Sequence, residues 1–443
     1  MSESLKVMAD GARMGTVTRD GKRLGFHYDS GWLESPQRYP LSLSMPLALK
    51  EHPHSVIEPF LWGLLPDNPQ ILEEWGRRFQ VSSRNAFRII SHVGEDCAGA
   101  VQFLRDDREH PQDTDTRQSR VSWIDEEDLT RRVRLLLENH GSTRLAGDSG
   151  QFSLAGVQPK LALHRHPTTG AWGVPEGNTP TTHILKPATG EFGGHAENEH
   201  FCLRLAAAIG LRTCRSSVIH AAGHAVIVVE RYDRLWRGDR CLRVHQEDTC
   251  QALAIHPDRK YQNEGGPGVR EIAALIRDQS SNPTADLATF ADALIFNWLI
   301  AGTDAHAKNF SLLIASGQQI RLAPLYDLAS ALPYPQRIDL QKAKLAMKIG
   351  GSYRLREIRR SHWESCARDL RMAANDLIAR AESMIERMTK ATLEVADLLH
   401  AEGIEDPVIG RLVDAVAIHT RECRERLANP KEGHDRGTQN PVV

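Results

Sequence analysis

Three polar residues in the second half of the chain supply the groups that phosphoryl transfer requires. Asp304 and Asn309 stand five residues apart in one segment, and Asp327 ends the short segment Leu325-Tyr326-Asp327. In protein kinases, an acid accepts the proton of the acceptor hydroxyl, an asparagine five residues later holds magnesium, and a further acid holds the metal and the phosphates. The types, order and spacing of these residues therefore predict a kinase-like active site.

A buried helix is expected directly before Asp304. Apolar residues between Phe290 and Ala301 recur at helical spacing, and Gly302 is placed to end the helix. Asp304 would then begin a loop beyond that helix. The alternative is a loop rich in Asn and Asp that caps a helix and has no chemistry.

Two short strands are expected to return Asp327 to this loop. The segments Phe310 to Ala315 and Gln319 to Leu325 are rich in apolar residues, and Ser316-Gly317 between them is typical of a tight turn. A hairpin of this kind would place Asp327 beside Asp304. The order of helix, loop, hairpin and acid is the order found in kinases.

Two upstream segments could contact nucleotide phosphates. Ser153 to Lys160 precedes a predicted strand, Leu161 to Arg165, and could bring backbone N–H groups and a lysine to the phosphates. This segment lacks a Walker pattern, and an ordinary hairpin turn is the alternative. The apolar segment Thr182 to Pro187 contains Lys186, at the position from which a kinase lysine reaches the α- and β-phosphates. A solvated surface lysine is the alternative there.

A helix and a strand follow that would complete a small lobe. Asn198 to Gly210 has an apolar helical face with Glu199 in its first turn, and Glu199 could pair with Lys186 or only complement the helix dipole. The apolar segment Ala225 to Val229 runs into Glu230 to Asp233, as a buried strand would run into a hinge between two lobes. Backbone groups of that hinge could bind adenine.

These segments, taken in order, resemble the HipA family of serine/threonine kinase toxins over nearly the whole chain. So many matches in one order are not expected by chance. The matching segments are Pro40 to Leu47, Leu64 to Asn68, Ser153 to Lys160, Thr182 to Lys186, Val229 to Arg234, Gln246 to Gln251, Gly265 to Gly268, Gly302 to Ser311 and Leu325 to Asp327.

The resemblance implies an enzyme that uses ATP and Mg²⁺, with Asp304 as the proton acceptor and with Asn309 and Asp327 as magnesium ligands. Lys186 would be the phosphate-binding lysine, and the hinge residues Glu230 to Tyr232 would flank adenine. The residues that the resemblance places at the nucleotide are Ala155, Gly156, Val157, Gln158, Lys160, Lys186, Glu230, Arg231, Tyr232, Gln246, His306, Lys308, Asn309, Tyr326 and Asp327.

The resemblance also implies that the protein is the toxin of a type II toxin–antitoxin module. Such a toxin phosphorylates an aminoacyl-tRNA synthetase and so stalls translation, and the glutamyl enzyme is the substrate that the resemblance indicates. A small DNA-binding antitoxin of the HipB type would hold it inactive, and operator DNA would be contacted only through that complex. Ser153 falls where the family carries an autophosphorylated serine, whose modification ejects the loop and switches the kinase off. A hydroxyl that only caps the loop is the alternative for Ser153.

The composition agrees with a protein of this kind and excludes some other classes. A chain of 443 residues with 41% hydrophobic residues can form two or three packed units, and a formal net charge of -2 argues against autonomous DNA binding. No stretch approaches the roughly 18 apolar residues of a membrane span, and the amino terminus lacks a signal-peptide pattern. Scattered cysteines without a paired spacing indicate reduced thiols. The expected location is the cytoplasm, without membrane contact.

The expected fold class is α+β: a two-lobed, protein-kinase-like (HipA-like) fold with an N-terminal α/β module and a mainly helical C-terminal lobe. Short alternating runs from Leu5 to Tyr28, separated by Asp-Gly pairs, predict a three-stranded meander, and Asp125 to Glu138 is predicted to be helical. The apolar stripe from Leu377 to Met388 is expected to be core rather than partner surface. The predicted limits are 1–145 for the module, 146–285 for the small lobe with the hinge and ATP-binding loop, 286–428 for the helical lobe with the catalytic loop, and 429–443 for a disordered tail.

Two other functions fit the same residues. A small-molecule kinase of the aminoglycoside-phosphotransferase type shares the acid and asparagine chemistry, and a closed acidic acceptor pocket would favour it over a kinase that modifies proteins. A catalytically silent partner, which works only as an antitoxin-dependent corepressor, belongs to a different class. A purely structural role would not require Lys186 together with the three polar residues around Asp304.

Overall fold

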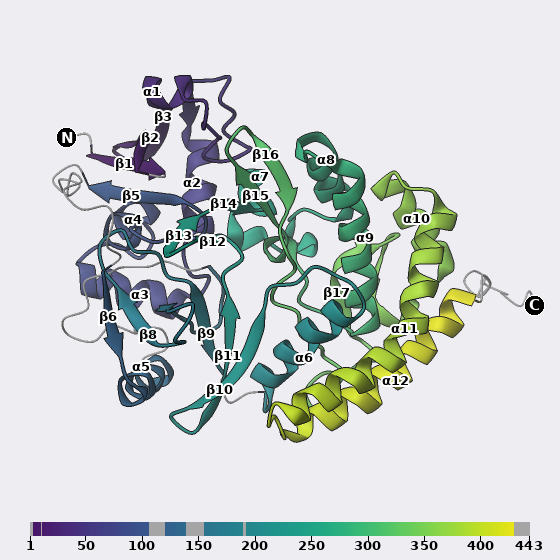
Figure 1. The fold of residues 1–443 in the computed structure, drawn as a ribbon. Helices are drawn as coiled ribbons and strands as arrows, with labels where there is room; N and C mark the ends of the chain where they lie inside the picture. Colours follow the sequence, from purple (N-terminus) through teal and green to yellow (C-terminus); the bar gives the residue numbers. More distant parts are fainter. Residues whose placement is uncertain (1–2, 10, 106–119, 139–154, 189–191, 429–443) are drawn as a thin grey trace, which may run out of the picture.

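The computed structural model describes residues 3–9, 11–105, 120–138, 155–188 and 192–428 of the chain. Strands from the first half of the sequence lie at one end of the molecule, and the C-terminal helices lie at the other (Figure 1). The predicted order, with strands first and helices last, is therefore confirmed. The predicted tail, 429–443, lies outside the described residues.

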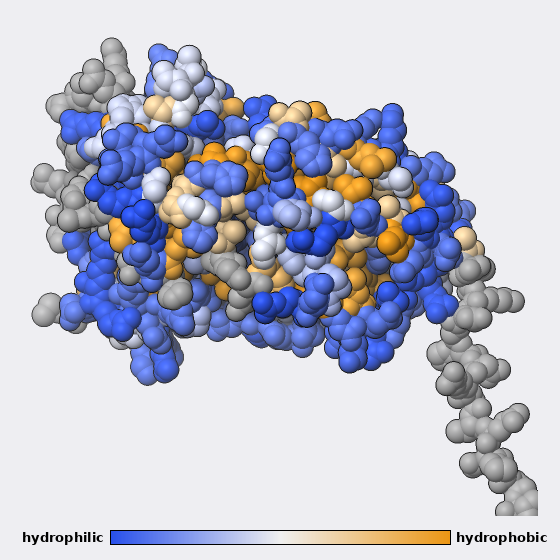
Figure 2. Space-filling view, turned by 90° about the horizontal axis from the view of Figure 1, so that it is seen from below, coloured by the Kyte–Doolittle hydropathy of each residue, from blue (hydrophilic) through white to orange (hydrophobic). Residues whose placement is uncertain are grey.

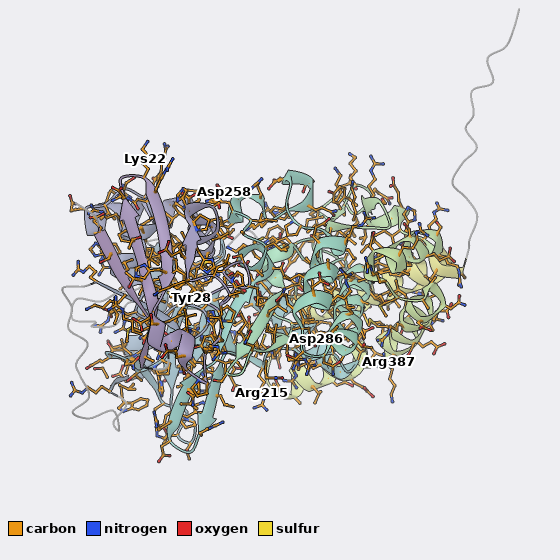
Figure 3. The ribbon with its side chains drawn as sticks, turned by 90° about the horizontal axis from the view of Figure 1, so that it is seen from above. Lys22, Tyr28, Arg215, Asp258, Asp286 and Arg387 are labelled. Carbon is orange, nitrogen blue, oxygen red and sulfur yellow. The ribbon has the colours of Figure 1, made fainter. Side chains whose placement is uncertain are left out.

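An antiparallel sheet with the strand order β4-β3-β2-β1-β5 opens the chain and confirms the predicted meander. Tyr28 accepts a hydrogen bond from Leu41 N (2.8 Å) and donates one to Met45 O (2.6 Å), so it fixes the segment after the meander against the sheet. Figure 3 shows Tyr28 within this part and Lys22 at its edge. The elements are β1 (Glu3–Ala9), β2 (Ala12–Asp20), β3 (Arg23–Tyr28), α1 (Ser30–Glu34), β4 (Glu51–Pro53), α2 (His54–Gly63), α3 (Pro69–Phe79), α4 (Ala86–Val93) and β5 (Val101–Arg105).

A second antiparallel sheet has six strands in the order β10-β11-β9-β7-β8-β6. The helix predicted from Asp125 to Glu138 is present as α5, and its Leu129 and Val133 share a buried cluster with Leu185 and Val228 of the sheet. α5 therefore packs against this sheet, and β6 is one of its strands. The limits of the domains given above remain a prediction. The elements are β6 (Val121–Ile124), α5 (Glu126–Glu138), β7 (Leu161–Arg165), β8 (Trp172–Pro175), β9 (His183–Pro187), α6 (His195–Ala208), β10 (Ser216–Ala221) and β11 (His224–Glu230).

The hairpin predicted around Ser316-Gly317 is confirmed, because β15 and β16 pair antiparallel, and β14 pairs with β15 on its other side. The long helices after it form the end of the molecule in Figure 1. The elements are β12 (Arg234–Arg237), β13 (Arg240–Arg243), β14 (His245–Asp248), α7 (Thr249–Ala252), η1 (Pro257–Arg259), η2 (Gln262–Glu264), α8 (Val269–Gln279), α9 (Pro283–Leu299), η3 (Ala307–Asn309), β15 (Ser311–Ala315), β16 (Gln319–Leu322), β17 (Lys344–Ile349), β18 (Ser352–Arg354), η4 (Leu355–Glu357), α10 (Arg360–Leu370), α11 (Ala374–Ala401) and α12 (Pro407–Ala428).

The helix before the candidate loop, α9, differs from the prediction at both ends. It begins at Pro283, because Asn282 caps it with its side chain, and it ends at Leu299. Ala301, with a φ of +50°, makes the turn out of the helix, so the expectation that Gly302 ends the helix was wrong. Glycine is needed at 302 for a different reason: a Cβ there would lie 2.2 Å from a side-chain oxygen of the helix.

Buried Asp286 ties the start of α9 to the hairpin. Its carboxylate accepts hydrogen bonds from Arg321 (3.0 Å), from Ser280 Oγ (2.6 Å) and from Leu322 N (2.9 Å). Burial opposes its charge, but these hydrogen bonds outweigh burial and lower the pKa of Asp286. Figure 3 shows Asp286 inside the part built from the middle of the chain. The helix that leads to the candidate loop is thus fixed at its first turn.

Most large apolar side chains are inside the molecule. The stripe predicted from Leu377 to Met388 is buried in α11, so its assignment to the core is confirmed. Seen from below, hydrophobic residues gather toward the middle of the surface, between hydrophilic margins (Figure 2). None of the described helices is both long enough and apolar enough to cross a membrane. Among the described residues, the large apolar ones that are exposed lie in loops and on several elements and are Leu49, Trp123, Val157, Leu235, Leu393, Leu398 and Ile418.

Candidate active site

Lys186, near the end of β9, lies between two carboxylates that come from separate segments. Its Nζ is 2.8 Å from Glu199 Oε1 in α6 and 2.8 Å from Asp327 Oδ1 beyond the hairpin. Burial disfavours the charged amine, but the two carboxylates outweigh burial and raise the pKa of Lys186 above its ordinary value. The ammonium is therefore charged and held in one place, as a lysine that contacts phosphates must be.

Glu199 pairs with Lys186, which decides between its two predicted roles. α6 begins at His195, so the acid in the first turn is Glu197, and the expectation that Glu199 lies there was wrong. The Glu199 side chain is only 1% exposed, and its Oε1 accepts a hydrogen bond from Lys186. A surface position for Lys186 is excluded by the same contact.

Asp327 combines a strained backbone with a charged side chain. Its φ is +55°, in the left-handed region that residues other than glycine seldom adopt, and such strain is concentrated at functional sites. The Lys186 ammonium holds the pKa of the Asp327 carboxyl well below its ordinary range. Because the side chain is also 45% exposed, Asp327 presents an ionised and accessible carboxylate.

The loop that carries Asp304 is held by hydrogen bonds to its own backbone. Asn309 Nδ2 donates to Asp304 O over 3.0 Å, and His306 N donates to the same oxygen over 2.8 Å. The Asp304 side chain is exposed, and its Oδ1 accepts a hydrogen bond of 2.5 Å from the Tyr261 hydroxyl. Burial lowers the pKa of His306, although the charges of Asp304 and Asp327 both act on its ring and oppose that shift. The charges of Asp304 and Asp327 thus act on the His306 imidazole, whose neutral form is favoured by burial.

The oxygens of Asn309 and Asp327 suit magnesium. Magnesium takes only one or two protein oxygens at kinase sites and fills its other positions with water and phosphate oxygens. The Asn309 amide nitrogen is engaged with Asp304 O, which leaves its carbonyl oxygen for a cation. Asp327 uses Oδ1 for Lys186 and keeps its second oxygen. The Asn309 carbonyl oxygen and the second Asp327 carboxylate oxygen therefore fit the magnesium ion that the sequence analysis expects.

Two stacked tyrosines connect the hinge to the catalytic loop. The ring centroids of Tyr232 and Tyr326 lie 5.5 Å apart, and the Tyr232 hydroxyl donates to Gln246 Oε1. The Tyr326 hydroxyl lies 2.6 Å from Ser311 Oγ and 2.6 Å from Lys308 O. Burial raises the pKa of both phenols, so both stay neutral. Stacking and hydrogen bonds thus join these residues into one partly buried cluster.

The Arg231 side chain is committed to a buried ion cluster instead of the adenine site. Its guanidinium donates to Asp233 and to Thr181, each over 2.8 Å, and lies 3.7 Å from Asp96. The side chain is only 2% exposed. Glu230, its neighbour in the hinge, has a side chain that is 40% exposed and remains accessible. Arg231 therefore serves the structure of the hinge.

The phosphate-loop segment is described from Ala155 onward, and Ser153 lies outside the described residues. Gln158 Nε2 donates to Pro187 O over 3.0 Å, which fastens the loop beside the strand that carries Lys186. Val157, the residue before Gln158, is 55% exposed. The loop thus lies next to Lys186 with its middle open to solvent, as a loop that receives phosphates should.

Gly156 joins this loop to the N-terminal module. Its φ of +110° favours glycine, and a Cβ there would lie 2.3 Å from Lys160 Nζ. Gly156 forms a parallel bridge with Pro66, and its carbonyl accepts the N–H of Asp67 over 3.1 Å. Lys160 Nζ donates to Ala155 O and closes the loop.

Asp67 forms a buried ion cluster that the sequence interpretation missed. Its Oδ1 lies 2.5 Å from Lys308 Nζ and its Oδ2 lies 2.8 Å from Lys260 Nζ. Burial opposes ionisation, but the two lysines outweigh it and lower the pKa of Asp67 to about 2. Lys308, expected at the nucleotide, is instead 4% exposed and paired with Asp67. In the sequence, Asp67 stood out only as part of the matching segment Leu64 to Asn68, and that match does not indicate which residues it pairs with.

The lowered pKa of Lys160 leads us to expect that nucleotide binding depends on pH. Burial and the nearby charge of Lys186 lower the pKa of Lys160 to about 8. A phosphate attracts the charged ammonium, so affinity should be constant where Lys160 is protonated and should weaken by up to about tenfold per unit as pH rises above that value. Calorimetry of ATP binding as a function of pH measures this course. The other charged groups that act on Lys160 are Asp327, Asp67 and Lys308.

Lys160→Arg is the matched control for this pH dependence. An arginine stays charged throughout the range, so the variant should bind ATP with an affinity that no longer falls above the pKa of Lys160. The same decline in the variant would assign the titration to another group.

Models of two protein domains match the chain. The HipA N-terminal domain matches residues 5–104, and the HipA-like C-terminal domain matches residues 152–396. Together they cover the parts that contribute Asp67, Lys186 and Asp304.

Known proteins are similar over most of the chain. Y4mE of Sinorhizobium fredii is 36% identical over 416 residues, which are 93% of this chain and 96% of Y4mE. The serine/threonine-protein kinase toxin HipA of Shewanella oneidensis is 29% identical over 389 residues, 84% of each chain. A chain in the solved complex of HipA, HipB and operator DNA from the same organism superposes with a TM-score of 0.79 at 24% identity, over 95% of this chain and 97% of that one. The predicted kinase-like fold class is confirmed, and the chain belongs to the HipA family of serine/threonine kinase toxins.

Proposed function

We propose that the protein is an ATP-dependent serine/threonine-protein kinase and the toxin of a type II toxin–antitoxin module. The observation that carries the proposal is the position of Lys186, whose ammonium is 2.8 Å from both Glu199 and Asp327. A protein kinase needs its strand lysine paired with a helix glutamate while the metal-binding acid is in place. Both conditions are met here, beside the loop that carries Asp304.

Each side chain of the site has one task in this proposal. Lys186 and Lys160 bind phosphate oxygens and orient the nucleotide; the two amines are close enough for the charge of Lys186 to lower the pKa of Lys160. Asn309 and Asp327 would hold magnesium, which neutralises charge on the phosphates when bound. Asp304 accepts the proton of the acceptor hydroxyl as that oxygen attacks the γ-phosphorus, while the bond from the γ-phosphorus to the β–γ bridging oxygen breaks and ADP leaves.

The exposure of Asp304 supports a protein acceptor. A kinase for small molecules encloses its acceptor, whereas the Asp304 carboxylate is exposed to solvent. A serine or threonine on a flexible segment of another protein could reach it. Family membership supports an aminoacyl-tRNA synthetase as that protein, with glutamyl-tRNA synthetase as the first candidate and with the cytoplasm as the place of action.

Two regulatory proposals follow from the same membership. Phosphate on Ser153 would bring negative charge into the loop around Gly156, where it would repel nucleotide phosphates and switch the kinase off. A solved relative forms a complex with HipB and operator DNA. A HipB-type antitoxin is therefore the proposed partner of this chain, and operator DNA is its partner only through that antitoxin.

Self-phosphorylation is the first test of the proposed function. Purified protein is incubated with ATP and Mg²⁺, and its peptides are mapped by mass spectrometry. We expect phosphate on Ser153 in the wild type and an unmodified peptide in Ser153→Ala. A protein that binds its antitoxin but transfers no phosphate to itself or to a panel of synthetases would contradict the proposal and support the corepressor role.

A further inference from the structure

Tyr261 contacts the proposed proton acceptor directly. Its hydroxyl donates a hydrogen bond of 2.5 Å to Asp304 Oδ1, across 43 residues of sequence. Burial, together with this hydrogen bond, raises the pKa of the phenol, so the hydroxyl keeps its proton at physiological pH. Tyr261 can therefore act on Asp304 only as a hydrogen-bond donor.

The contact leaves one carboxylate oxygen of Asp304 for the acceptor. An ionised carboxylate has two oxygens, and both accept hydrogen bonds. Tyr261 occupies Oδ1, while Asn309 Nδ2 and His306 N hold the backbone oxygen of Asp304. An exposed aspartate without such a donor would rotate among several positions. Here the side chain is held at Oδ1, and Oδ2 is the oxygen that Tyr261 does not contact.

Tyr261 is itself held on three sides. Its ring meets the His306 ring edge to face, with centroids 4.9 Å apart, and Lys260 Nζ lies 5.6 Å from its centroid. Its backbone oxygen accepts the N–H of Gly266 over 3.0 Å. Glycine is required at 266, because a Cβ there would lie 2.1 Å from Arg259 O. The glycine-rich turn thus closes on Tyr261 and keeps its hydroxyl in place.

The residue before Tyr261 anchors it to two other parts of the molecule. Lys260 Nζ pairs with Asp67 of the N-terminal module at 2.8 Å. Lys260 O accepts the N–H of Ala307, in the catalytic loop, over 3.3 Å. Lys260 therefore fixes the segment that carries Tyr261 to both the N-terminal module and the loop of Asp304.

We propose that Tyr261 is a positioning residue for phosphoryl transfer: its hydroxyl holds Asp304 so that the second carboxylate oxygen meets the acceptor hydroxyl. The inference rests on the proposed kinase function, which makes Asp304 the proton acceptor. The side-chain contacts of Tyr261 are with Asp304, His306 and Lys260, and it therefore acts on turnover rather than on nucleotide binding.

Tyr261→Phe is the test, because it removes the hydroxyl and keeps the ring on His306. We expect kcat to fall by about 10- to 100-fold, the range of a general-base contribution that is weakened but not removed. The KM for ATP, and the dissociation constant of ATP by calorimetry, should stay within about twofold. Tyr353→Phe, in β18 and outside the site, is the matched control and should change neither quantity.

A second measurement places Tyr261→Phe in the Asp304→Asn background. Residues that act as a unit are not additive, so the second substitution should leave the residual rate unchanged. An additive loss, a wild-type kcat in Tyr261→Phe, or a loss confined to the KM for ATP would each overturn the inference. A faster Tyr261→Phe would also overturn it, by showing that the hydroxyl blocks the acceptor. Wild-type protein without any phosphoryl transfer would overturn the kinase function itself, a result visible without any variant.

Discussion

Asp304→Asn is expected to reduce phosphoryl transfer by about 10³-fold while the protein stays folded. The amide has the size of the carboxylate but cannot accept the proton of the attacking hydroxyl. Its oxygen can still accept the hydrogen bond from Tyr261, and the side chain is exposed, so packing is little changed. The rate of phosphate incorporation into Ser153 and into an acceptor protein, together with the melting temperature, measures both parts of this expectation.

ATP binding should survive this substitution. The groups proposed to contact phosphates and magnesium, Lys186, Asn309 and Asp327, keep their partners when residue 304 changes. Asp258→Asn is the matched control, since its carboxylate is 87% exposed at the surface (Figure 3) and lies outside the site. A residual rate within tenfold of the wild type would mean that another group accepts the proton.

Short-range features of the site could be predicted from the sequence. The hairpin after Asp304 follows from two apolar runs around Ser316-Gly317, and the strand that carries Lys186 follows from its apolar residues. Both signals act over a few residues, where turn chemistry and side-chain spacing dictate the structure. The ends of α9 were less well predicted, because the cap by Asn282 and the turn at Ala301 lie outside the apolar pattern.

Contacts between distant segments could not be predicted from one sequence. The ion pair of Asp67 with Lys308 joins residues 241 apart, and nothing in either segment indicates the other. Arg231 shows the same limit in part, because its acidic partner Asp233 is only two residues away, whereas Thr181 and Asp96 lie far upstream and the sequence does not indicate them. Lys308 was placed at the nucleotide by the resemblance, and its position in the loop does not indicate that Asp67 is its counter-ion.

Asp67→Asn is expected to destabilise the protein by about 3 kcal/mol, because the change leaves two buried ammonium groups without a counter-charge. The pKa of about 2, against an ordinary 3.8, corresponds by itself to about 2 kcal/mol at neutral pH. That contribution is present above about pH 4 and is lost as pH falls through about 2, since the folded-state pKa is the lower one. Denaturant unfolding at neutral pH measures the difference.

Asp339→Asn is the control for Asp67→Asn. The Asp339 carboxylate pairs with Lys342 at the exposed surface, so its loss should leave the unfolding midpoint unchanged. In a Lys308→Met background, Asp67→Asn should cost less than in the wild type, because one of the two stranded charges is already gone. Equal costs in both backgrounds would show that the pair is not the source of the stability.

The turnover of folded Asp67→Asn decides what the N-terminal module contributes to catalysis. Asp67 touches the catalytic loop through Lys308, the Tyr261 segment through Lys260, and the phosphate loop through Gly156. Loss of the carboxylate charge would loosen the contacts with Lys308 and Lys260, whereas the contact with Gly156 is made by the Asp67 backbone N–H and remains. Misplacement of reacting groups by about 1 Å can cost about 10²-fold in rate. We therefore expect kcat to fall at least about tenfold at a temperature where the variant is fully folded. If turnover per folded molecule were unchanged, the module would stabilise the kinase without taking part in its active site.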